Sequence, residues 1–143
     1  MLRVLLPVDG SENAVRATQA LIDTLDWYKV PPAVDLLAVH LPVPQLPNMS
    51  LVITHEMLER YYAEETDSMM AASRKCLDAA GVRYTAKKRV GPIAESIVDQ
   101  ARQTGSNMIY MGTRGMTAFA NVLLGSVATR VLHLAHIPVV LIH

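Results

Sequence analysis

Met111 to Ala128 reads MGTRGMTAFANVLLGSVA, a glycine-rich stretch between a short apolar run and a segment with helical spacing. Gly112 and Gly115 directly follow residues 108–111 (MIYM), which are typical of a buried strand. Gly125 and Ser126 open the segment that follows. Glycine lets the backbone approach an anion closely, and a helix start adds N–H donors and a positive dipole end. The stretch therefore predicts a phosphate site; the alternative is that these glycines only form turns.

Composition limits the classes of protein that the chain can belong to. Its 143 residues fit one domain over 1–143, and 51% hydrophobic with 18% charged residues indicates a globular protein. Thirteen basic and thirteen acidic side chains cancel, which removes the electrostatic case for nucleic acid as a partner. No apolar run approaches the ~20 residues of a membrane span, and the N-terminal apolar run stops at Pro7 and Asp9, too early for a signal peptide. With Cys76 as the single cysteine, we expect a cytoplasmic protein.

Apolar runs alternate with helical periodicities along the chain. The runs predict strands at residues 3–8, 34–40, 82–90, 107–111 and 138–142. Helices are predicted from Ser11 to about Leu25, over a long segment that ends at Gly81, from Pro92 to Gly105, and over residues 124–135. Residues 41–54 carry three prolines and are predicted to be irregular. Five strands alternating with four helices predict an α/β fold, a single three-layer α/β/α domain of Rossmann-like type with a parallel sheet.

The long central helix carries a recurring set of residues that we expect on its inner face. These are Leu58, Tyr61, Glu65, Met69, Ser73, Cys76 and Ala80. Their spacing follows the helical repeat, so the set predicts the contact with the sheet.

Two strand ends carry distinctive residues, Asp9 after the first strand and Gly112 after the fourth. In open parallel sheets, ligands bind beyond the carboxyl ends of the strands, where the strand order reverses. If the first and fourth strands are neighbours, one crevice contains both residues.

The glycine spacing resembles that of a known family. Gly112-x2-Gly115-x9-Gly125-Ser126 is similar to the nucleotide-binding pattern of the ATP-binding branch of the universal stress protein family. Residues 4–11 (VLLPVDGS) and 91–97 (GPIAESI) resemble it too, so the similarity covers essentially the whole chain. It implies an adenine nucleotide alpha hydrolase-like fold with strand order 3-2-1-4-5. It also implies that ATP, ADP or AMP binds with Mg²⁺ in the crevice, and that dimers are common.

The resemblance also implies roles for individual residues. Pro7 and Asp9 would border the ribose, with the Asp9 carboxylate accepting from a hydroxyl or facing the metal. Val39 would contact adenine through its main chain, and Gly125 with its neighbours would close over the phosphates. The full implied set is Pro7, Val8, Asp9, Val39, Met111, Gly112, Thr113, Arg114, Gly115, Met116, Thr117, Gly125, Ser126 and Val127. Two alternatives stay open: Asp9 as a turn or cap residue, and Arg114 as a solvated loop cation.

Motifs for other chemistries are missing. The chain has no G-x-x-x-x-G-K-[ST] and no G-x-G-x-x-G, and its five histidines lack the spacing of a zinc site. We therefore expect an ATP-binding regulatory module in stress response with little turnover and no catalytic residue. Slow ATP hydrolysis or phosphoryl transfer is the alternative. A flavin-binding electron carrier is disfavoured, because Trp27 and Phe119 are the only Trp and Phe.

The last predicted strand, from Pro138 to Ile142, carries no charge and lies at a sheet edge in the implied order. An apolar edge of this kind promotes pairing, so we expect a homodimer through it. The alternatives are a strand too short to pair or one covered by a loop. Any protein partner of the regulator remains unidentified by sequence.

Overall fold

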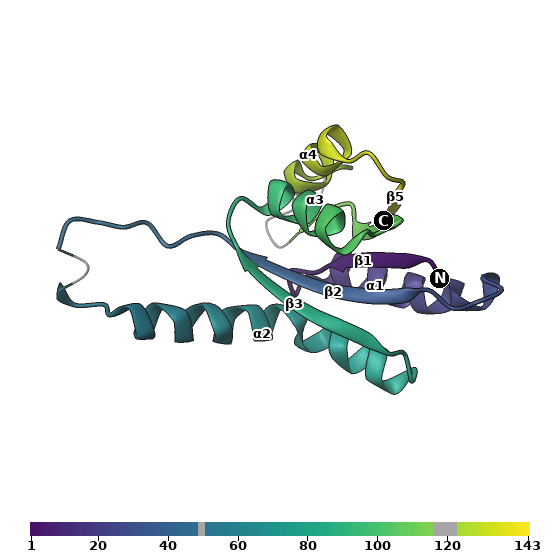
Figure 1. The fold of residues 1–143 in the computed structure, drawn as a ribbon, viewed down its shortest axis with the longest axis horizontal. Coiled ribbons are helices and arrows are strands. Elements are labelled where there is room, and N and C mark those ends of the chain that lie inside the picture. Colours follow the sequence, from purple (N-terminus) through teal and green to yellow (C-terminus); the bar gives the residue numbers. More distant parts are fainter. Residues whose placement is uncertain (49–50, 116–122) are drawn as a thin grey trace.

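The computed structural model describes residues 1–48, 51–115 and 123–143 and contains five strands and four α-helices within them (Figure 1). The strands are β1 (Arg3–Pro7), β2 (Ala33–His40), β3 (Tyr84–Val90), β4 (Met108–Gly112) and β5 (Val139–Ile142). The helices are α1 (Glu12–Thr24), α2 (His55–Ala79), α3 (Ile93–Thr104) and α4 (Ser126–Leu134), with a 3₁₀ turn η1 (Leu25–Trp27) after α1.

All strand pairs are parallel, and the sheet has the order β3-β2-β1-β4-β5. This confirms the predicted fold class and strand order. β1 is central and pairs with β2 from Arg3↔Ala33 to Pro7↔Leu37, and with β4 at Val4↔Met108 and Leu5↔Ile109. The chain leaves β1 for β2 on one side and later returns to β4 on the other. The order therefore reverses between β1 and β4, as a crevice there requires.

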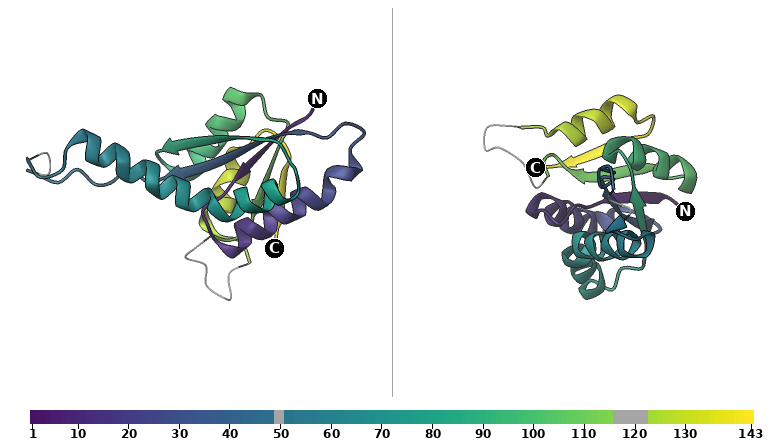
Figure 2. Two further views of the ribbon diagram at one scale, coloured as in Figure 1. Left: turned by 90° about the horizontal axis from the view of Figure 1, so that it is seen from below. Right: turned by 90° about the vertical axis from the view of Figure 1, so that its left-hand side faces the viewer.

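The helices form two layers around the sheet (Figure 2). α1 and α2 cover one face, and α3 and α4 cover the other. Neighbouring residues of β1 point to opposite faces of the sheet, and both faces are buried. Leu6 belongs to the cluster under α1 and α2, whereas Leu5 belongs to the cluster under α3 and α4. A strand buried on both faces is apolar at every position.

Several element bounds differ from the predicted ones by one or two residues. The third strand begins at Tyr84 rather than residue 82, and the fourth ends at Gly112 rather than residue 111. The fourth helix spans Ser126–Leu134, inside the predicted 124–135, because Gly125 has extended backbone angles and serves as its N-cap. Pro92 is likewise the N-cap of α3, with ψ of 130°, and not its first helical residue.

The predicted inner face of α2 was partly wrong. The buried residues are Thr66, Met70, Ser73 and Leu77, a stripe rotated by one position from the predicted set except at Ser73. The first part of α2, with the chain before it, extends beyond the sheet (Figure 1), and Tyr61 there is 42% exposed. This part of the helix reaches only the end of β2, where the Tyr61 ring lies 5.6 Å from that of His40, so its apolar residues do not mark the main contact face.

No helix within residues 1–48, 51–115 and 123–143 is long and apolar enough to cross a membrane.

Candidate functional site

Asp9 and Gly115 bring the ends of β1 and β4 into contact. A Cβ added at Gly115 would lie 2.6 Å from Asp9 Oδ2, far inside van der Waals contact. A side chain at position 115 would therefore displace either the Asp9 carboxylate or the loop. Asp9 Oδ1 accepts from the backbone N–H of Ser11 over 2.9 Å, so the turn role considered for Asp9 is present through one oxygen. The other oxygen faces the loop after β4.

Gly125 joins the start of α4 to the same loop. Its backbone N–H donates to the backbone oxygen of Thr113 over 2.6 Å. An added Cβ would lie 3.2 Å from that oxygen and 3.3 Å from Arg114 Cα. Both neighbours are backbone atoms that cannot swing aside, so the close approach favours glycine. The structure therefore brings together the two halves of the glycine pattern.

The first turn of α4 adds donors to this junction. The first N–H groups of a helix have no partner within it, and the dipole places partial positive charge there. Gly125 caps the helix through its backbone oxygen, which accepts from the backbone N–H of Thr129 at 3.0 Å and from its hydroxyl at 2.9 Å. Ser126, the first helical residue, is exposed. This arrangement suits an anion.

Gly112 has a packing role that the sequence did not predict. An added Cβ would lie 2.9 Å from Asn13 Cβ and 3.0 Å from its backbone carbon and oxygen. Asn13 is buried near the start of α1, and its Oδ1 accepts from Arg16 Nη2. Gly112 therefore lets the end of β4 pack directly on α1. Nothing in the spacing of positions 13 and 112 indicates this contact.

Two polar side-chain atoms in the loop are buried without a partner among the described residues. They are Thr113 Oγ1 and Arg114 Nε, and Thr113 is only 7% exposed. An unsatisfied buried polar atom is destabilising by about 1–3 kcal/mol. Such atoms beside a helix start and a glycine loop fit a polar ligand.

The main chain of Val39 faces the crevice. Leu37 oxygen accepts from Val8 N–H over 2.8 Å, so the peptide groups of residue 37 point toward β1. His40 oxygen accepts from Gly91 N–H on the opposite side. Because this direction alternates along a strand, the peptide groups of Val39 point to the β1 side, where β1 has already ended at Pro7.

The remaining predicted residues divide by burial. Pro7, Val8 and Met111 are buried, and the latter two belong to the core clusters, so only their backbones border the crevice. Val127 is half-buried against the α3–α4 cluster. Met116, Thr117 and Phe119 lie outside the described residues. Trp27, in η1, is 80% exposed.

An ion pair that the sequence did not predict holds α3 to α4 near this end of the sheet. Arg130 Nε donates to Glu95 Oε1 over 2.9 Å. The pKa of the Glu95 carboxyl is lowered, first by its own backbone N–H and then by Arg130. Glu95 sits in the first turn of α3, and Arg130 lies one turn after Ser126. No sequence spacing links the two positions.

Metal coordination by side chains alone finds no support in the described parts of the chain. Among residues 1–48, 51–115 and 123–143, no group of three or more His, Cys, Asp or Glu side chains could hold a metal ion.

The order of the strands and the glycine junction define the class, a nucleotide-binding type of α/β fold. The profile of the Universal stress protein family matches residues 1–143, and the chain belongs to this family.

Individual relatives agree with that assignment. Universal stress protein MJ0531 of Methanocaldococcus jannaschii is 27% identical over 141 residues, which cover 98% of this chain and 81% of the relative. A universal stress protein of Mycolicibacterium smegmatis is 30% identical over 146 residues, and the chain spans about half of that relative, 47% of its length.

Solved structures show the same fold. Hypothetical protein MJ0577 has a TM-score of 0.81 at 28% identity, with 99% of this chain and 94% of that chain covered. A universal stress protein in complex with cAMP has a TM-score of 0.68 at 19% identity, covering 99% and 97% of the two chains. The universal stress protein from Archaeoglobus fulgidus in complex with dAMP has a TM-score of 0.61 at 23% identity, covering 100% and 98%.

Proposed function

We propose that residues 1–143 form one universal stress protein domain that binds an adenine nucleotide in the crevice between β1, β4 and α4. The observation that carries the proposal is that two glycines of the pattern each lie in close contact with a neighbouring segment. Gly115 lies against the Asp9 carboxylate, and Gly125 lies against the backbone of Thr113 and Arg114. Three segments that are separate in sequence thus meet at the end of the sheet where such folds bind ligands.

The adenine end of the ligand would lie beside β2. The peptide groups of Val39 point into the space beyond the end of β1. A backbone N–H donor and a backbone C=O acceptor of β2 are therefore directed there. An adenine ring offers both kinds of partner on one edge. The ribose would then lie near Pro7 and the Asp9 carboxylate, which accepts from a hydroxyl or faces a metal ion.

The phosphates would lie over the glycine junction. The first turn of α4 supplies N–H donors, Ser126 supplies an exposed hydroxyl, and Thr113 supplies a buried hydroxyl without a partner. The complexes of two relatives with cAMP and dAMP support an adenine nucleotide as the class of ligand. We propose ATP in particular, with ADP or AMP as the alternative ligands, because the glycine spacing resembles the ATP-binding branch. Mg²⁺ would be held through the phosphates and Asp9.

Regulation is the role that this site supports better than catalysis. Rapid phosphoryl transfer needs a positioned base or water and concentrated positive charge at the transferred group. The described part of the crevice offers backbone N–H groups, hydroxyls and the Arg114 side chain. We therefore propose a cytoplasmic stress-response module that changes its binding to an unknown protein partner with its nucleotide state.

A homodimer completes the proposal. All four residues of β5 are half-buried in the isolated chain, although the strand is apolar and at the sheet edge. Pairing of two copies through this edge would satisfy the backbone groups that one chain leaves open.

The test begins with the purified protein. Denaturation, followed by chromatography and mass measurement of the supernatant, identifies any nucleotide that was carried through purification. Calorimetric titration of nucleotide-free protein with Mg-ATP, and separately with GTP, measures affinity and base selectivity. We expect saturable ATP binding that exceeds GTP binding. Equal affinity for both would contradict the adenine site, and a released flavin would contradict the class of ligand.

A further inference from the structure

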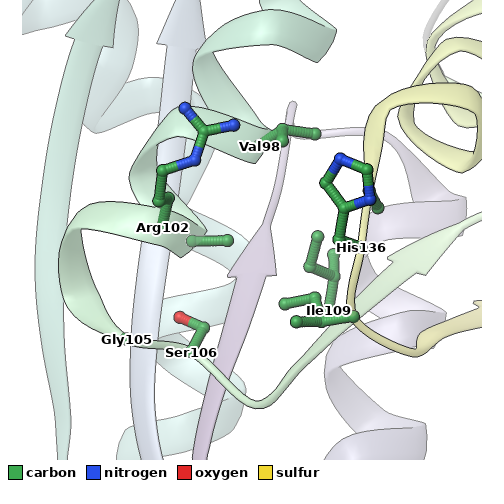
Figure 3. A pocket seen from close by; sticks show the side chains of 9 residues that line it. Val98, Arg102, Gly105, Ser106, Ile109 and His136 are labelled. Atoms are coloured by element: carbon green, nitrogen blue, oxygen red, sulfur yellow. The ribbon is translucent and has the colours of Figure 1, made fainter.

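A cavity lies at the opposite end of the sheet from the glycine junction (Figure 3). Its volume is about 230 Å³. It opens between the last turn of α3, the turn into β4 and the turn that leads from α4 to β5. The lining residues are Val98, Ala101, Arg102, Gly105, Ser106, Ile109, Ala135, His136 and Ile137. None of them belongs to the predicted nucleotide set.

The floor of this cavity is apolar. Ile109 is fully buried, and Val98 and Ala101 are 9% and 4% exposed. Ala135 and Ile137 are half-buried against the same core cluster. The hollow is half open to solvent, and its volume of about 230 Å³ has room for a body the size of one six-membered ring with a small substituent, held partly at the surface.

The rim carries a cation and an N–H donor. Arg102 and His136 lie on opposite sides of the cavity, and both side chains are directed toward its mouth (Figure 3). Arg102 is permanently charged, and its Nη1 lies 3.5 Å from Asp99 Oδ1, a long contact within one exposed turn of α3. A guanidinium has five donors, so this contact leaves others able to reach a ligand.

We propose that this cavity binds a small monocarboxylate with an apolar body, such as an aromatic acid of one ring. The ring lies in the hollow against Ala135 and Ile137, which cover the buried Ile109, and the carboxylate lies between Arg102 and His136. Charge selects the anion, because the guanidinium and a carboxylate form paired hydrogen bonds of matching geometry. This site is independent of the proposed nucleotide site, because the two share no residue.

The test uses benzoate as the probe and benzyl alcohol as its uncharged counterpart. Titration of the full chain, followed through the methyl signals of Val98, Ile109 and Ile137, reports binding at the floor. We expect saturation by benzoate at millimolar concentration and an affinity for benzyl alcohol about tenfold weaker. Absence of methyl shifts, or shifts that do not saturate, would overturn the proposal, as would a second copy of the chain that covers the cavity and blocks the probe.

Two kinds of variant separate the floor from the rim. Ala135→Leu fills the hollow and should remove binding of both probes. Arg102→Gln with His136→Gln should weaken benzoate about five- to tenfold, the range of partly exposed charge contacts, and leave benzyl alcohol unchanged. Arg60→Gln, an exposed arginine on the projecting part of α2, is the matched control and should change neither affinity. If Ala135→Leu does not fold, the rim variants decide alone. Equal loss of both probes in them would overturn recognition of the carboxylate.

Discussion

The backbone N–H of Gly125 donates to the backbone oxygen of Thr113 over 2.6 Å, which ties the start of α4 to the end of β4. The oxygen that accepts this bond belongs to the residue whose own N–H donates to Ile142 in β5. The loop after β4, the adjacent strand and the helix start are therefore held as one unit. A phosphate bound at α4 would meet donors that are already in place, which lowers the ordering required on binding.

We predict that Gly115→Val and Gly125→Val each weaken Mg-ATP binding strongly while the fold is retained. A branched side chain would meet the Asp9 carboxylate in one case and backbone atoms in the other. A clash of about 3 kcal/mol corresponds to a loss of affinity of roughly a hundredfold. Calorimetric titration measures the affinity, and circular dichroism reports the fold.

Gly81→Ala is the matched control for this loss. Gly81 has φ of 67° and open space around its Cβ position, so alanine there is strained without a clash. The variant should lose some stability and keep its nucleotide affinity. Near-normal affinity in both valine variants would exclude the glycine junction as the nucleotide site.

We predict that bound ATP turns over far more slowly than the ~1–10³ s⁻¹ typical of enzymes. The chain lacks a P-loop lysine, and the described part of the proposed crevice offers mainly backbone donors and hydroxyls. A steady-state phosphate-release assay on protein from two independent purifications provides the measurement. A rate of several per second that disappears in Gly125→Val would establish an enzyme instead.

The fold could be predicted from sequence because its signals are local. A strand buried on both faces, such as β1, needs apolar residues at every position, and glycine or proline marks where each element stops. The strand order was implied by the family resemblance, because hydrophobic periodicity alone does not indicate which strands pair. The one misplaced face was that of α2, where the helical spacing of Leu58 and Tyr61 continues into a part of the helix that meets the sheet only at His40, the last residue of β2.

At the candidate site, the positions that favour glycine could be predicted from sequence. Gly115 and Gly125 were singled out by spacing, and each has a contact that favours glycine. Apart from the meeting of Asp9 with the glycine loop, contacts between distant segments were not predictable. The fit of Gly112 against Asn13 and the ion pair of Glu95 with Arg130 depend on how helices pack, which leaves no signal in either local sequence. The cavity between α3 and α4 arises from packing in the same way.

We predict that Arg3→Met destabilises the protein by about 3 kcal/mol, because it removes the partner of a buried carboxylate. Asp35, in β2, is 1% exposed, and its Oδ2 lies 3.0 Å from Arg3 Nη1. Urea unfolding measures the change in the free energy of unfolding. The double variant Arg3→Met/Asp35→Leu should recover most of the loss, since no charge is then left buried. A double variant as unstable as the single one would show that packing, and not the unpaired charge, is responsible.

The pH dependence of stability has one contributor between α2 and β3. A hydrogen bond from Lys88 Nζ at 2.7 Å lowers the pKa of the Asp67 carboxyl from 3.8. A carboxyl whose pKa is lower in the folded state stabilises the fold above its unfolded pKa. That stabilisation is lost as the pH falls through the lower, folded-state pKa.

We therefore predict that Asp67→Asn reduces the loss of stability on acidification below about pH 4, and lowers stability slightly at neutral pH. Urea unfolding at a series of pH values measures both. Lys88→Gln should have most of the same effect, because it removes the main cause of the lowered pKa and leaves only the weaker attraction of Arg74, 3.7 Å away. If the stability of both variants falls on acidification as steeply as that of the wild type, Asp67 is not the group responsible.

The last prediction concerns assembly through β5. In the sheet order observed, β5 is an edge strand, and Val139 to Ile142 carry no charge. Two copies that meet across a two-fold axis pair antiparallel, which satisfies the open N–H and C=O groups of both strands and closes the assembly. We expect a dimer at tens of micromolar by light scattering. Val140→Lys with Ile142→Lys should give a monomer, because like charges are brought together across the axis.

Both positions also pack partly against the cluster under α1 and α2, so the lysines could act through the core of one chain. The matched control is Thr85→Lys with Ala86→Lys on β3, the opposite edge, where both residues are exposed and the strand already carries Lys87, Lys88 and Arg89. It adds the same charge and should leave the dimer intact. Thermal unfolding of the β5 variant should show one cooperative transition, which separates dissociation from unfolding. A wild-type monomer would show that no such interface forms. A β5 variant that stays dimeric would place the interface elsewhere, since charge on an unpaired edge has no partner to repel.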